Sequence, residues 1–267
     1  MELSKRLQAV ADLLSTDLKV ADIGCDHGFV SIYLVESGKA SRCLAMDVNK
    51  GPLERAGEHI LEKRLSTYIE TRLSDGAKAI QFITNENGVK TLEVDAAIIA
   101  GMGGRLMIKI IQDSLEKFQA MQEFVLQPQS EIAKVRQFIR DIGFIITAED
   151  MVLEEGKFYP MIKAVNKERK YISITENSSI SDSWKKAEKK PLEKECFGKQ
   201  ELYDNFGEHL LNKQHPVLQQ FLQKEAGLYE EILTSLKKQD SEKSKERQKE
   251  IKQKLQLIYQ GLEWFQT

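Results

Sequence analysis

Apolar residues recur at helical spacing at the start of the chain and then fall into short runs separated by further helical patterns. Leu3, Leu7, Val10 and Leu14 predict a short amphipathic helix over residues 3–14. Six apolar runs follow and predict strands over residues 18–23, 42–46, 67–73, 94–100, 124–126 and 144–146. The segments between them, 31–37, 51–64, 106–120 and 132–142, have the period of helices. Strands and helices are therefore predicted to alternate along this part of the chain.

This alternation predicts the fold class. Strands that are almost fully apolar, such as 94–100, are typical of a parallel sheet whose two faces are both covered by helices. Residues 151–165, with Glu155 and Gly156 in their middle, have the pattern of a closing hairpin. We therefore predict a Rossmann-like α/β sheet that ends in an antiparallel hairpin.

The second half of the chain has a different composition. Residues 166–199 are rich in Lys, Glu and Ser with few apolar positions, which is typical of a linker or insert. From residue 200 onward two apolar stripes at helical spacing flank the polar stretch 237–246. They predict an antiparallel coiled-coil hairpin, with a simple helical subdomain as the alternative. The predicted division is thus 1–165, 166–199 and 200–267.

Composition narrows the class of protein. The 267 residues are 41% hydrophobic and 30% charged, with a net charge of −2. No apolar run is long enough to span a membrane, and the N-terminus lacks the apolar core of a secretory signal. The three cysteines lack metal-ligand spacing. We expect a cytoplasmic protein with no metal and no membrane partner. The net charge neither requires nor excludes a local basic face for nucleic acid.

Residues 22–28, Asp-Ile-Gly-Cys-Asp-His-Gly, follow the first predicted strand and open a helix. Glycines at such a turn let the backbone approach a ligand closely. The middle glycine of a dinucleotide fingerprint is replaced by Asp26, whose carboxylate would repel pyrophosphate and attract a cationic group. His27 is a candidate base contact or proton carrier. The alternatives are a tight turn without a ligand and, for His27, a helix cap.

Acidic residues and glycines also follow the next three strands. Asp47 lies 23 residues beyond Gly24, a distance that suits a carboxylate bound to ribose hydroxyls, with a helix N-cap as the alternative. Asp75-Gly76 is a candidate contact to an adenine edge, or a plain turn. Residues 101–104, Gly-Met-Gly-Gly, either border a reacting base with bare backbone or merely permit a sharp turn. Gln127-Pro128-Gln129 is a candidate polar wall or a solvated loop. Ligands of open α/β sheets bind at this end of the strands.

Several segments together resemble a known family. In chain order they are Leu3-Ser4-Lys5-Arg6-Leu7, the 22–28 turn, Arg72-Leu73-Ser74-Asp75-Gly76, Ile99-Ala100-Gly101-Met102-Gly103-Gly104, Leu126-Gln127-Pro128, Glu155-Gly156-Lys157-Phe158-Tyr159, Phe206-Gly207, Leu210-Leu211 and His215-Pro216-Val217. The chain resembles the bacterial tRNA (adenine 22-N1)-methyltransferase family, TrmK. It departs from the family in a longer polar stretch around 173–199 and in Asp47, where a longer acid is common.

The resemblance implies a class I methyltransferase sheet with a C-terminal α-helical coiled-coil hairpin. It also implies methyl transfer from S-adenosylmethionine to N1 of adenine 22 in tRNA. Asp26 is the candidate for stabilising charge on the base, with His27 as proton acceptor. The expected cofactor contacts are Arg6, Asp22, Gly24, Asp26, His27, Gly28, Asp47, Val48, Asp75, Gly76, Gly101, Met102 and Gly103.

The alternative functions are an NAD(P)-dependent oxidoreductase on the same fold and a non-catalytic RNA-binding protein. The replaced middle glycine and the lack of a recognisable Tyr-Lys or His pair count against the first. The intact cofactor signals count against the second. The oligomeric state stays open, with a monomer as the expectation.

Overall fold

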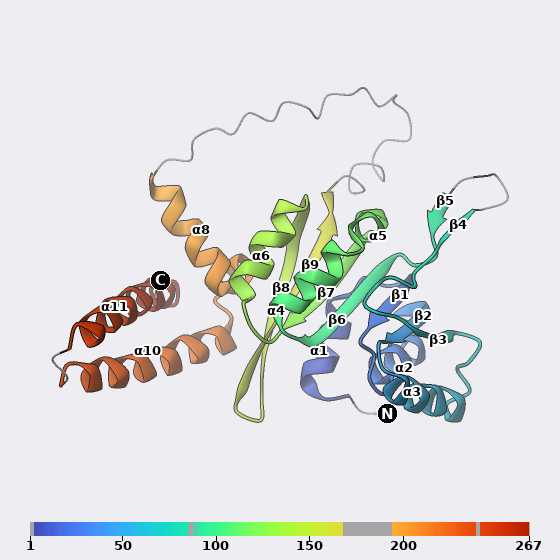
Figure 1. The fold of residues 1–267 in the computed structure, drawn as a ribbon, viewed down its shortest axis with the longest axis horizontal. Helices are drawn as coiled ribbons and strands as arrows, with labels where there is room; N and C mark the ends of the chain where they lie inside the picture. Colours follow the sequence, from blue (N-terminus) through green and yellow to red (C-terminus); the bar gives the residue numbers. More distant parts are fainter. Residues whose placement is uncertain (1–2, 85–87, 89, 168–193, 239–240, 267) are drawn as a thin grey trace, which may run out of the picture. The chain divides into compact units, whose positions relative to one another are not determined.

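The structure is a computed structural model that describes residues 3–84, 88, 90–167, 194–238 and 241–266 (Figure 1). The chain divides into two compact units, residues 1–186 and 187–267. Most of the predicted linker 166–199 lies outside the described residues. The predicted boundaries at 165 and 199 therefore stay predictions.

The N-terminal unit is built on one seven-stranded sheet. Its elements are α1 (Lys5–Leu13), β1 (Leu18–Ile23), α2 (Phe29–Glu36), β2 (Ala40–Asp47), α3 (Lys50–Glu62), β3 (Ile69–Leu73), β4 (Phe82–Thr84), β5 (Lys90–Leu92), β6 (Ala96–Met102), α4 (Gly104–Gln112), α5 (Leu115–Ala120), β7 (Glu123–Pro128), α6 (Ile132–Asp141), β8 (Phe144–Glu154) and β9 (Lys157–Asn166). The strand order is β3-β2-β1-β6-β7-β9-β8, with β4 and β5 forming a separate two-stranded sheet.

The strand pairings confirm the predicted fold class. Strands β3, β2, β1, β6 and β7 pair in parallel, and β9 pairs antiparallel with both β7 and β8. The chain leaves β1 toward β2 on one side of the sheet and later returns to place β6 on the other side. This reversal opens a crevice outside the carboxyl ends of β1 and β6, where open α/β sheets bind their ligands.

Helices cover both faces of the sheet, as its apolar strands predict (Figure 1). One apolar cluster joins buried residues of α1, α2 and α3 to side chains such as Val20 and Ile98. The other joins α4, α5 and α6 to the opposite face, through side chains such as Ile23 and Ile99. Neighbouring strand residues thus point to opposite faces, and both faces are apolar.

Three local features differ from the predictions. The predicted helix 106–120 is two helices, α4 and α5, interrupted at Asp113 and Ser114. The predicted strand 144–146 continues without interruption into the closing hairpin as β8, which turns at Glu155 and Gly156 with positive φ at both. The short strands β4 and β5 were not predicted, because three residues carry too little periodicity.

The C-terminal unit is helical where it is described. Its helices are α8 (Lys194–Phe206), α9 (Glu208–Asn212), α10 (Pro216–Leu236) and α11 (Glu242–Glu263). Helices α10 and α11 are antiparallel, because the Gln214 side chain donates to the Trp264 carbonyl at one end and Ser244 Oγ donates to the Leu236 carbonyl at the other. Their buried residues include Leu222 of α10. The predicted helical region is confirmed, whereas its coiled-coil packing stays a prediction.

Candidate active site

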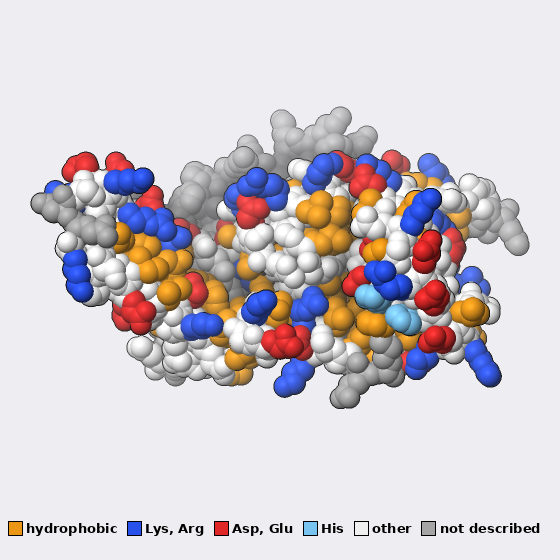
Figure 2. All heavy atoms as spheres, turned by 60° about the horizontal axis from the view of Figure 1, so that its bottom comes forward, with side chains coloured by type: hydrophobic (Ala, Val, Ile, Leu, Met, Phe, Trp, Pro, Cys, Tyr) orange, Lys and Arg blue, Asp and Glu red, His pale blue; other side chains and the backbone are white. Residues whose placement is uncertain are grey.

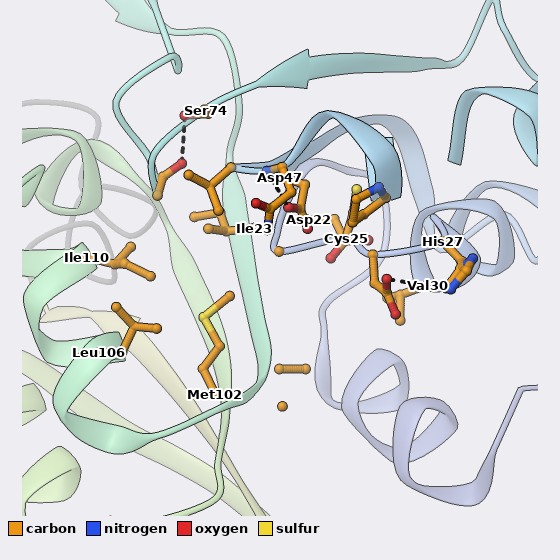
Figure 3. Close-up of a pocket in the computed structure, with 18 of the residues that line it drawn as sticks. Asp22, Ile23, Cys25, His27, Val30, Asp47, Ser74, Met102, Leu106 and Ile110 are labelled. Carbon is orange, nitrogen blue, oxygen red and sulfur yellow. Dashed lines mark hydrogen bonds and ion pairs between the residues drawn. The ribbon is translucent and has the colours of Figure 1, made fainter. Parts of the chain in front are cut away.

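A cavity of about 540 Å³ lies at the carboxyl ends of β1, β2, β3 and β6 (Figure 3). Its volume is in the range of small-molecule sites. The predicted cofactor contacts that line it are Arg6, Asp22, Gly24, Asp26, His27, Asp47, Val48, Asp75, Gly76, Gly101 and Met102. Gly28 and Gly103 are not among its lining residues. Residues far apart in the sequence are thus brought to one site.

The turn after β1 explains two of its glycines. Gly24 has a φ of +80°, and a Cβ atom there would lie 2.2 Å from Cε of Met102. Its N–H donates to the Met46 carbonyl, which ties the turn to the end of β2. Gly28, at a φ of +73°, would place a Cβ atom 3.1 Å from that of Ala56. Gly24 therefore shapes the cavity, whereas Gly28 lets α2 pack against α3.

Asp22 is the deepest carboxyl group of the cavity. The side chain is buried, and Ser31 Oγ donates to its Oδ2 at 2.7 Å. The pKa of Asp22 is raised to about 6, chiefly by burial; the Ser31 hydrogen bonds oppose this rise, and the nearby Asp47 adds a little to it. Burial raises the pKa of the Cys25 thiol well above its usual range, and the negative charge of Asp22 adds to this rise. Cys25 is therefore a protonated wall residue and unsuited to nucleophilic chemistry.

Asp47 ends β2 beside Asp22, and the two side chains are neighbours in Figure 3. Asp47 is buried, and its Oδ1 accepts a hydrogen bond from the Asn49 N–H at 2.8 Å. That bond supports the turn before α3. Asp47 thus has a role similar to the helix N-cap that was the alternative interpretation of the sequence. The cavity lining includes Asp47 as well, so one carboxylate can both hold the turn and face a ligand.

Asp26 and His27 lie at the rim of the cavity. Asp26 has a φ of +50° and a side chain that is 68% exposed, so its carboxylate faces solvent. His27 Nε2 lies 3.6 Å from Asp26 Oδ1. The His27 ring stacks on Phe29 at 5.4 Å, and His59 Nδ1 donates to the His27 carbonyl at 3.0 Å. His27 and His59 are the histidines of the N-terminal unit and form its pale-blue patch in Figure 2.

The wall opposite His27 combines a turn and a helix. Asp75 is exposed and accepts a hydrogen bond from Lys78, which lowers the pKa of its carboxyl group. Gly76 has a φ of +61° and lies close to Ile110. Leu106 and Ile110 of α4 supply apolar surface (Figure 3). Neither residue was predicted from the sequence, although α4 begins at Gly104, within the 101–104 turn, and nearness to that turn was a signal that could have found them.

The structure revises the interpretation of the Gly-Met-Gly-Gly turn. Gly101 and Met102 line the cavity. A Cβ atom on Gly104 would lie 2.4 Å from the Ser130 carbonyl oxygen and 2.8 Å from Val135 Cγ2. Gly103 would meet Ser130 Oγ at 3.1 Å. The last two glycines are therefore explained by close packing against the loop after β7, and only the first half of the turn borders the cavity.

The charged side chains that line the cavity are mostly acidic. Four aspartates line it, at positions 22, 26, 47 and 75, and Arg6 is the one lysine or arginine among the described lining residues. Carboxylates favour positively charged and hydroxyl groups and disfavour a pyrophosphate. The cavity therefore suits a ligand with cationic groups, hydroxyls and one carboxylate.

Comparisons with known proteins agree with this geometry. Residues 3–162 match the family model "Methyltransferase domain". The chain belongs to this family. Over 164 residues it is 32% identical to the tRNA (adenine(22)-N(1))-methyltransferase of Bacillus subtilis, and the match covers 61% of this chain and 65% of that relative, slightly under two thirds of its length.

Two solved structures are similar over almost the whole chain. One is a Streptococcus pneumoniae protein classed as a tRNA (m1A22) methyltransferase, in complex with S-adenosyl-L-methionine. It is 28% identical, with 98% of this chain and 100% of that chain covered and a TM-score of 0.73. The other is B. subtilis TrmK, which is 25% identical, with 98% and 99% covered and a TM-score of 0.73. The resemblance to TrmK predicted from the motifs is confirmed.

The part of the chain that the structure describes contains neither a membrane-spanning helix nor a cluster of metal-binding side chains. No helix there is long and apolar enough to cross a membrane. Among the same residues, no group of three or more His, Cys, Asp and Glu side chains is arranged to hold a metal ion.

Proposed function

We propose that the protein transfers a methyl group from S-adenosylmethionine to N1 of adenine 22 in tRNA. The charge pattern of the cavity carries this proposal. S-adenosylmethionine has a sulfonium group, an ammonium group and one carboxylate, and its ribose carries two hydroxyls. The four aspartates and Arg6 of the lining are complementary to these groups, whereas the aspartates would repel the pyrophosphate of a dinucleotide.

The lining residues fit the parts of the cofactor. Asp47, at the end of β2, is proposed to accept hydrogen bonds from the ribose hydroxyls, since strand-end carboxylates of this fold do so. Asp75 and Gly76, with Ile110 as an apolar wall, are proposed to contact the adenine. Asp22 is proposed to face the cationic amino-acid end, and Arg6 its carboxylate. The remaining predicted contacts line the same cavity, apart from Gly28 and Gly103.

S-adenosylmethionine supplies an electrophilic methyl group to such a site. Ring N1 of adenine already has an in-plane lone pair, so holding the base in position provides most of the acceleration. The methylated base is cationic until a proton leaves N6. Asp26 at the rim is proposed to stabilise that charge. His27 is proposed to accept the proton; its ring stacks on Phe29, and its backbone carbonyl accepts the hydrogen bond from His59.

The relatives support tRNA as the substrate and adenine N1 as the target, because the B. subtilis relative bears that name. The free thiols of Cys25 and Cys43 agree with the reducing cytoplasm, where we propose that the protein acts. For the oligomeric state we propose a monomer.

Nucleoside mass spectrometry tests the proposal. Unmodified tRNA is incubated with the protein and S-adenosylmethionine, digested and analysed for 1-methyladenosine. We expect the product from a transcript that carries adenine at position 22 and none from the same transcript with guanine there. Methylation of both transcripts would reject the position, and methylation of neither, with cofactor bound, would favour a non-catalytic RNA-binding protein. Asp26→Asn and His27→Ala should lower the methylation rate at saturating cofactor by more than they weaken cofactor binding.

A further inference from the structure

Three motifs that lie far apart in the sequence meet at one side chain of the cavity. Arg6 lies in the N-terminal Leu-Ser-Lys-Arg-Leu segment, Gln127 in Leu-Gln-Pro and Tyr159 in Gly-Lys-Phe-Tyr. Arg6 Nη1 donates to Gln127 Oε1 at 2.9 Å. The guanidinium carbon of Arg6 lies 5.3 Å from the centroid of the Tyr159 ring. Residues from α1, β7 and β9 therefore converge on the guanidinium that lines the cavity.

Gln127 is built to hold this position. Its side chain is completely buried, and Oε1 accepts a second hydrogen bond from the Gly101 N–H at 3.1 Å. Its Nε2 donates to the Pro128 carbonyl. An amide nitrogen in place of Oε1 would face two N–H donors, so the orientation of the amide is determined by its neighbours. The same oxygen thus links Arg6 to the turn that borders the cavity.

The positive charge of Arg6 is left for a ligand. The Glu154 carboxylate accepts from the backbone N–H of Arg6, at 3.4 Å, and not from its guanidinium. Among the described residues, no carboxylate forms an ion pair with that guanidinium. The neutral contacts to Gln127 and Tyr159 restrain the long side chain without neutralising it. A restrained guanidinium loses less conformational entropy when it binds an anion.

We propose that Gln127 and Tyr159 are positioning residues that hold the Arg6 guanidinium as the receptor for the carboxylate at the amino-acid end of S-adenosylmethionine. This inference rests on the proposed function. The buried amide fixes one edge of the guanidinium, and the Tyr159 ring covers its face. The remaining N–H groups of Arg6 are then available for the carboxylate of the bound cofactor.

Two ligands separate this role from a structural one. S-adenosylhomocysteine and 5′-methylthioadenosine share the adenosine and the thioether sulfur, and only the first carries the amino-acid end. Calorimetry on the full chain should show that Arg6→Leu weakens S-adenosylhomocysteine binding roughly 10- to 100-fold, the effect of removing charged hydrogen bonds. The same variant should bind 5′-methylthioadenosine as the wild type does.

The positioning residues should reproduce this selectivity at smaller size. Gln127→Met removes the acceptor and should weaken S-adenosylhomocysteine binding roughly 3- to 10-fold. Tyr159→Leu should weaken it about threefold, whereas Tyr159→Phe keeps the ring and should restore wild-type affinity. In the Arg6→Leu background, Tyr159→Leu should add nothing. Tyr159 is partly exposed, so its variants test the proposal even where Gln127→Met does not fold.

Equal reductions in affinity for both ligands in the Gln127 and Tyr159 variants would overturn the inference and make these residues merely structural. Unchanged affinity of Arg6→Leu for S-adenosylhomocysteine would overturn it as well. A wild-type chain that binds neither ligand would instead reject the proposed function, so the two failures are distinguishable.

Discussion

The buried carboxyl group of Asp22 should make both stability and cofactor binding depend on pH. Its pKa rises from 3.8 to about 6, chiefly through burial. This rise corresponds to a loss of about 3 kcal/mol in the free energy of unfolding once the group is ionised in both states. The site therefore stores an electrostatic cost, which a cationic ligand next to the carboxylate would relieve.

The sign follows from proton binding. Below about pH 4 the folded and unfolded chains both hold the proton, and Asp22 has no effect. Between about pH 4 and 6 the unfolded chain loses its proton first, so the folded state binds more protons and stability falls as the pH rises. Above about pH 6 the full cost is present.

The matched variant is Asp22→Asn, which stays neutral and can still accept the Ser31 hydrogen bond. Urea unfolding at several pH values should show the variant more stable than the wild type by up to about 3 kcal/mol at pH 7, with the difference vanishing near pH 4. Asp141→Asn, which changes an exposed aspartate at the end of α6, is the control and should alter stability little at any pH.

Cofactor binding should change in the opposite direction. Asp22→Asn should weaken S-adenosylmethionine binding at pH 7, and wild-type affinity should fall as the pH drops below about 6, because protonation removes the negative charge. Calorimetry in buffers of different ionisation enthalpy should detect proton release on binding near pH 6. Parallel stability curves of wild type and Asp22→Asn from about pH 4 to 8 would refute the reasoning.

Three further predictions concern other parts of the molecule. Asp47→Ala should weaken S-adenosylmethionine binding by roughly 1–3 kcal/mol, since the ribose hydroxyls would have no acceptor; calorimetry with unchanged affinity would exclude that contact. Gly104→Ala should lower the thermal midpoint, because its Cβ atom would lie 2.4 Å from the Ser130 carbonyl oxygen; an unchanged midpoint would contradict the close approach. Lys243, Lys245 and Arg247 are exposed on α11, and both signs of charge occur on the visible face of the C-terminal unit, at the left of Figure 2. Replacing all three with Ala should lower the salt slope of tRNA binding by roughly 0.7–0.9 for each phosphate that is no longer neutralised, and an unchanged slope would remove α11 from the RNA interface.

The order of the elements and the places of the ligand-binding turns can be recognised from the amino-acid sequence alone. Strands such as 18–23 and 94–100 are recognisable because burial on both faces leaves them mostly apolar, with Lys19, Asp22 and Asp95 as the exceptions. Turns such as 22–28 are recognisable because a left-handed backbone requires glycine at Gly24 and Gly28. Both signals are local, so one sequence is enough to read them.

The contacts that each of these residues makes depend instead on the tertiary structure. Arg6 reaches Gln127 across 121 positions of the chain, because the sheet places the end of β7 beside α1. The buried state of Asp22 and the contact that demands Gly104 likewise depend on packing between distant segments. The prediction of a single helix over 106–120 is wrong for a related reason. The helix is interrupted at Asp113 and Ser114, and this lets α5 pack its Phe118 ring against Phe124 of β7. Periodicity reports which positions are apolar, and only the strand order determines which of them meet.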